Sequence, residues 1–208
     1  MRLLPPAWAA ALAVATLAPR AAAQDPRLAR LDPGARASVV ALLDSARTAG
    51  LPAEPLMQRA LEGATKGAPP ERVVAAVRRL AVDLGSARDA LGPKASAPEL
   101  EAGAAALRAG VPPAILTRLH TARRPPLTVP LAVLADLVAG GVPVDSAGAA
   151  ILTLARTTGD ADLVEFRRAV ERDIALGAPP AAAAAVRLSS ITQGADRGAN
   201  PSQQPRRP

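Results

Sequence analysis

Hydrophobic positions recur at intervals of three and four residues along most of this chain. The clearest example is the run from Val73 to Leu84, whose apolar residues form one stripe of an amphipathic helix, whereas Arg72, Arg79 and Asp83 stand on its other face. No segment shows the strict alternation and β-branched enrichment that predict a strand. The pattern therefore predicts an all-α protein of about nine short helices. The expected helices start at or just after Pro33, Ala53, Pro69, Ser96, Pro112, Thr128, Pro143, Asp160 and Pro180.

A recurring triplet of glycine, a small or apolar residue and proline separates many of these stripes. Its glycines are Gly50, Gly67, Gly110, Gly141 and Gly177. Glycine adopts the left-handed conformation just past a helix end, the next residue folds back as in a Schellman motif, and proline suits the next helix start. The copies are 17 to 43 residues apart, which is unlike a tetratricopeptide or ankyrin array. The expected architecture is an irregular stack of helical hairpins, either α-solenoid-like or an orthogonal bundle.

Polar residues predict how several helices begin. Asp32, Thr128 and Asp160 each precede an apolar stripe and are expected to be N-caps. Ser96 with Glu99 three residues later has the spacing of a capping box. The last helix is expected to end near Leu188 or a little beyond.

Composition predicts four regions along the chain. Residues 1–23 have a short basic start, an uncharged apolar run and a small-residue cleavage pattern, which together are typical of a signal peptide cut before Gln24. A retained membrane anchor is the alternative, but the apolar run is shorter than the roughly 20 residues of a span. Residues 24–122 and 123–193 form two helical lobes or one continuous domain, with a hinge at 123–127. Residues 194–208 are polar and basic, and are expected to be a disordered tail.

Charge and composition exclude several classes of function. The whole chain has 25 Lys and Arg against 18 Asp and Glu, and a net charge of +7. Removing the predicted signal and tail leaves about +3, which is too weak a basic balance for a nucleic-acid partner. The chain has no Cys and only one Trp and one Phe, which excludes disulfides, thiolate chemistry and stacking platforms. We therefore expect export to the periplasm or the exterior, no cofactor, and no membrane span after cleavage.

Few residues are candidates for chemistry. His120 is the single histidine, has no carboxylate within one helical turn and is flanked by arginines, so we expect neither a metal ligand nor a general base. Glu62, Gly63 and Lys66 could form a small binding notch, or Gly63 could allow close helix packing beside a surface ion pair. A last group could contact an anionic surface or could simply be solvated: Arg123, Arg124, Arg206 and Arg207.

Three functional hypotheses remain open at this level. The first is an exported, non-enzymatic helical protein that acts as a protein–protein interaction or scaffold module, because stacked hairpins present surfaces for protein partners. The second is a cationic envelope-associated structural protein that binds anionic glycan or lipid through Arg123, Arg124 and the basic tail. The third is an enzyme of unknown class, and no catalytic residue is assigned to it.

Overall fold

The computed structural model describes residues 25–199, so the predicted signal peptide and residues 200–208 lie outside the described residues. Within residues 25–199 the chain forms nine α-helices, one short 3-10 helix and no strand, which confirms the all-α prediction. The elements are η2 (Pro26–Arg30), α1 (Pro33–Thr48), α2 (Glu54–Thr65), α3 (Pro70–Leu91), α4 (Ala97–Arg108), α5 (Pro113–Ala122), α6 (Thr128–Ala139), α7 (Val144–Thr157), α8 (Asp160–Ala175) and α9 (Pro180–Ala199).

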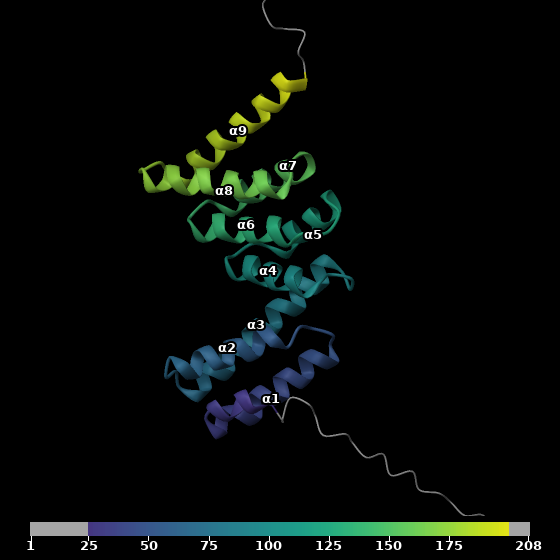
Figure 1. Cartoon of the computed structure of the whole chain (residues 1–208), viewed down its shortest axis with the longest axis vertical. Helices are drawn as coiled ribbons and strands as arrows, with labels where there is room; N and C mark the ends of the chain where they lie inside the picture. The colour runs from purple at the N-terminus through teal and green to yellow at the C-terminus, as the bar shows by residue number, and fades with distance from the viewer. Residues whose placement is uncertain (1–24, 200–208) are drawn as a thin grey trace, which may run out of the picture.

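The helices follow one another along the long axis of the molecule (Figure 1). The odd-numbered helices α1, α3, α5, α7 and α9 form one row in which each packs on the next. Helices α4, α6 and α8 form a second row, whereas α2 packs on η2, α1 and α3. This arrangement is the irregular helical stack that the sequence predicted, and it has α-solenoid-like connectivity.

The five Gly-x-Pro triplets reverse the chain as predicted. At Gly141 φ is +91°, and its amide donates to the Val138 carbonyl while the Val142 amide donates to the Leu137 carbonyl, each at 3.0 Å. These are the two hydrogen bonds of a Schellman motif. The same pair of bonds and a positive φ occur at the other four glycines. The motif ends α1, α2, α4, α6 and α8, so the predicted stops are confirmed.

The buried side chains form two apolar clusters. One joins η2, α1, α2, most of α3 and part of α4, and includes Leu43 and Leu56; the other extends from the end of α3 to α9, around Leu134 and Phe166. The clusters meet along α3 and α4, where Ala95 and Leu107 pack against both. The predicted division into lobes 24–122 and 123–193 is a statement about which parts of the chain fold as units. The positions of the two clusters do not test it, so the division stays a prediction.

Glu99 is the one buried charged residue in the described part of the chain, with 4% of its surface exposed. Its Oε2 accepts hydrogen bonds from the Ser96 amide (2.8 Å) and hydroxyl (2.7 Å), as expected for a capping box. Its Oε1 accepts from the Leu127 amide at 2.8 Å. Burial raises the pKa of the Glu99 carboxyl, but these hydrogen bonds outweigh it and hold the pKa below its usual value. Glu99 therefore links the start of α4 to the start of α6.

Of the four predicted N-caps, Ser96 and Asp32 are confirmed, whereas Thr128 and Asp160 are wrong. Asp32 accepts from the Gly34 amide at 2.7 Å and caps α1 as expected. Helix α6 has Leu127 at its N-cap, so Thr128 is its first residue; the Leu127 amide already bonds Glu99 and its side chain is buried. Helix α8 has Gly159 at its N-cap and Asp160 as its first residue, because Asp160 pairs with Arg123 instead.

Helix α9 is longer than its apolar pattern indicated. It continues to Ala199, past the predicted end near Leu188 and into the segment that we expected to be disordered. The rest of that segment lies outside the described residues.

The first prediction tests the left-handed stop with a matched pair of glycines. Gly110 has φ +100°, Gly85 lies inside α3, and a methyl group added at either meets no atom within 4 Å. Gly110→Ala should lower the free energy of unfolding by about 1–2 kcal/mol through backbone strain alone. Gly85→Ala should raise it by up to about 1 kcal/mol, because alanine favours helix. Urea unfolding measures both; a neutral Gly110→Ala variant would refute the conformational requirement.

The second prediction concerns acid stability. Because the folded pKa of Glu99 is lowered, its contribution is fully present above the unfolded pKa and is lost as the pH falls through the folded value. Glu99→Gln should lower the free energy of unfolding at neutral pH by about 1–3 kcal/mol, since its amide nitrogen faces backbone donors. It should also flatten the decline of stability below about pH 4.5. An unchanged acid profile in urea unfolding would contradict this role.

Candidate binding cleft

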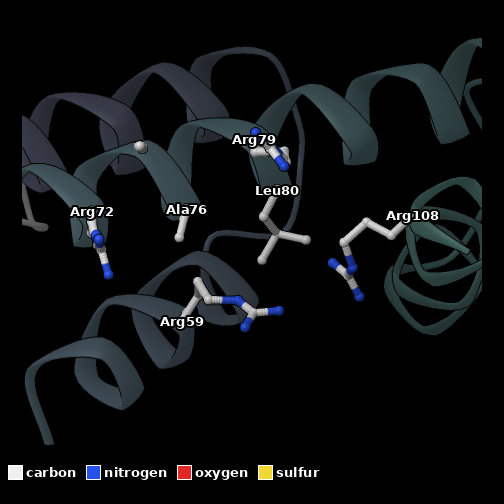
Figure 2. Close-up of a pocket in the computed structure, with 7 residues that line it drawn as sticks. Arg59, Arg72, Ala76, Arg79, Leu80 and Arg108 are labelled. Carbon is white, nitrogen blue, oxygen red and sulfur yellow. The ribbon is translucent and has the colours of Figure 1, made fainter. Parts of the chain in front are cut away.

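A hollow of about 360 Å³ opens on α3 between α2 and α4 (Figure 2). Four of the seven residues that line it are arginines, and no acidic residue is among them. The lining residues are Arg59 from α2, Arg72, Ala75, Ala76, Arg79 and Leu80 from α3, and Arg108 from α4. We call this hollow the arginine cleft.

The length of α3 produces the cleft. Helix α3 has 22 residues, or about 33 Å, whereas α2 and α4 have 12 residues each, or about 18 Å. A methyl group at Gly63 of α2 would lie 2.9 Å from Val73, near the start of α3. One at Gly103 of α4 would lie 3.0 Å from Ala87, near its end. The two short helices thus contact opposite ends of α3 and leave the polar face of its middle turns exposed.

Periodicity places the arginines of α3 on the open face. Arg72, Ala76 and Arg79 are separated by four and three residues, so they lie along one side of the helix. The guanidinium groups of Arg59 and Arg108 extend into the space from the two flanking helices, and Leu80 projects between them (Figure 2). The cleft therefore combines a small apolar floor with cationic groups from three helices.

Most of the positive charge in the arginine cleft has no counterion within residues 25–194. Arg59 forms an ion pair with Glu62 at 3.2 Å, but Arg72, Arg79 and Arg108 form no ion pair or side-chain hydrogen bond in this part of the chain. Asp83 follows Arg79 by one turn of α3, yet it forms no ion pair with any cleft arginine. Neighbouring like charges repel, so a bound anion would relieve an unfavourable arrangement.

Sequence reasoning missed this site. It placed Arg72 and Arg79 on the polar face of a helix and did not connect them with Arg59 or Arg108. The available signal was the apolar stripe of α3, which continues beyond Leu84 through Ala87 to Leu91. That length exceeds what either neighbouring segment could cover.

The structure places the three residues of the predicted notch beside the cleft. Glu62 bonds Lys66 at 2.6 Å, and this hydrogen bond, with the charges of Lys66 and Arg59, lowers the pKa of the Glu62 carboxyl. Gly63 lies against Val73, so side-chain atoms fill the space in front of it. The observed geometry at Gly63 is close helix packing next to a surface ion pair. Whether these residues form a binding notch stays a prediction.

The predicted anion contacts differ in their surroundings. Arg123 donates to Asp160 Oδ1 at 2.5 Å and to the Thr158 carbonyl at 3.4 Å, so it links the α5–α6 connection to the start of α8. Arg124 is exposed and has no ion pair within the described residues. Arg206 and Arg207 lie outside them.

Other kinds of site find little support within residues 25–194. His120 is exposed on α5, and no group of three or more His, Cys, Asp or Glu side chains there could hold a metal ion. Among the described helices, none is both long enough and apolar enough to span a membrane. Comparisons with protein-family models, curated proteins and solved structures returned no match.

The third prediction separates the two neighbouring arginines. Arg123→Ala should lower the free energy of unfolding by about 1–2 kcal/mol, because it leaves a partly exposed Asp160 and the Thr158 carbonyl without their charged donor. Arg124→Ala makes the same charge change at an exposed site and should stay within about 0.5 kcal/mol of the parent. If thermal or urea unfolding gave the same change in the free energy of unfolding for both variants, the contacts of Arg123 with Asp160 and Thr158 would not stabilise the fold.

Proposed function

We propose that this protein is a non-enzymatic binding module that holds another protein on its stack of helical hairpins. The observation that carries the proposal is the arginine cleft, where three helices present cationic side chains around an open, partly apolar floor. Stacked hairpins provide extended surfaces for protein recognition. Arginine is enriched at protein interfaces, where its apolar stem and planar charged group contribute together.

The chemistry of the cleft favours binding over catalysis. Its polar lining consists of guanidinium groups, which stay protonated and therefore cannot exchange protons with a substrate. No nucleophile or carboxylate lines it. A cleft of this composition is suited to recognising negative charge.

We further propose that the protein acts after export. The support is the pattern of residues 1–23, which has the basic start, apolar run and small-residue cleavage site of a signal peptide. The absence of cysteine means that the fold has no need of disulfide formation in that compartment.

Attachment to anionic glycan or lipid through Arg123 and Arg124 has less support. The guanidinium of Arg123 is already paired with Asp160, so using it for a surface would break a contact between helices. Arg124 alone contributes at most about 1 kcal/mol near an anionic surface.

The fourth prediction tests the location of a protein partner. Because the chain has no cysteine, Ala76→Cys in the cleft and Ala149→Cys at an exposed position of α7 each give a unique site for a photo-crosslinker. After irradiation in an extract of the source cells, the Ala76→Cys protein should give one discrete protein adduct, identified by mass spectrometry. Excess unlabelled parent protein should suppress it.

The Ala149→Cys protein is the control for non-specific proximity, because it has the same label on a different helix. An adduct confined to the cleft variant supports the proposal. The same adducts from both variants, or none from the cleft variant, would contradict it.

A further inference from the structure

We infer that the arginine cleft takes an extended acidic peptide segment whose carboxylates stand three residues apart and pair with Arg72 and Arg79. This inference rests on the proposed function, because it gives the chemistry of the partner at the same site. The juxtaposition that carries it is two unpaired arginines along one face of α3, with a third on α4 and an apolar floor between them.

The spacing of the two α3 arginines sets the spacing of the ligand charges. Arg72 and Arg79 are seven residues apart, which places their backbone positions about 10 Å apart along the helix and on nearly the same side. In an extended polyproline II segment, residues three apart share a face and are separated by about 9 Å. Carboxylates at those positions match the two guanidinium groups in both distance and direction.

Charge complementarity selects an anion for this site. Arg72, Arg79 and Arg108 have no ion pair within the described part of the chain, so a ligand carboxylate would not have to displace an internal partner. Arg72 and Arg79 are both exposed, so their side chains can adjust to a flexible peptide. The guanidinium fork also binds a carboxylate through two parallel hydrogen bonds.

The shape of the cleft favours a peptide over a compact anion such as phosphate. A phosphate site gathers its donors around one point, often at backbone amides of a helix start. Here the guanidinium groups are spread over three helices, and Ala75, Ala76 and Leu80 lie among them. An extended segment can place a small apolar residue on this floor between its two carboxylates.

The volume of the hollow limits how much of a partner can enter it. This volume is about 360 Å³, near the lower end of the roughly 300–1,000 Å³ of ordinary ligand pockets. That space suits a few side chains of an extended segment. The apolar residues of the cleft are accessible to a ligand because α2 and α4 contact different ends of α3 and leave a gap between them.

The fifth prediction uses fluorescence anisotropy with a short labelled synthetic peptide that has two glutamates three positions apart in a proline- and alanine-rich frame. The parent protein should bind it, and increasing salt should weaken binding because exposed ion pairs are screened. Arg72→Ala combined with Arg79→Ala should weaken binding by about tenfold and by no more than about 25-fold, since each exposed pair contributes up to about fivefold. Both residues are exposed and unpaired, so circular dichroism and urea unfolding should match the parent.

A second double variant provides a control with equal charge. Arg118→Ala with Arg168→Ala removes two exposed arginines from α5 and α8, outside the cleft lining, and should leave peptide affinity within about twofold of the parent. A peptide with adjacent glutamates should bind more weakly, and the matching glutamine peptide should not bind. Each of these results supports the inference.

Three results would overturn the inference: equal losses in both double variants, equal binding of the glutamine peptide, or displacement of the peptide by inorganic triphosphate at lower concentration than by unlabelled peptide. The crosslinking experiment distinguishes this failure from failure of the proposed function. A cleft-specific protein adduct without peptide binding refutes only the acidic segment. Absence of that adduct refutes the binding module itself.

Discussion

The left-handed glycine after a helix end is the constraint on which this structure depends. At each of five positions the chain leaves one helix and enters another after four or five residues, and a side chain at positive φ would oppose that turn. The Schellman hydrogen bonds use carbonyls that the helix end would otherwise leave unpaired. Because the reversals are short, successive helices must pack on near neighbours, and a stack is the natural result.

Helix length then decides where the stack is complete and where it is open. Helices α4, α6 and α8 pack in sequence, whereas α3 is longer than α2 and α4 and extends beyond both. The apolar stripe of α3 is buried along the whole helix, which stabilises the fold, but the polar side of its middle turns stays accessible. The arginine cleft therefore follows from the difference in length between α3 and the two helices beside it. Within residues 25–194, three of its four arginines (Arg72, Arg79 and Arg108) form no ion pair, unlike Arg123, which pairs with Asp160.

Local signals predicted what local physics controls. The capping box at Ser96 and Glu99 and the cap at Asp32 depend on a few adjacent residues, and both were predicted from their spacing. Thr128 and Asp160 have equally good capping chemistry, but distant partners overrode it. The Leu127 amide donates to the Glu99 carboxylate, and the Arg123 guanidinium donates to the Asp160 carboxylate. These contacts join residues that are 28 and 37 positions apart, and the periodicity of hydrophobic residues within one helix does not predict them.

By itself the sequence determined the all-α class, the five stops and the apolar face of each helix, because helical periodicity and left-handed glycine are properties of short segments. It also identified Glu62, Gly63 and Lys66 as a unit with two alternative roles. The tertiary structure places Val73 against Gly63, and whether the three residues bind a ligand stays a prediction. The tertiary structure alone brought Arg59, Arg79 and Arg108 around one hollow, because they come from three helices whose relative position depends on packing between segments distant in sequence.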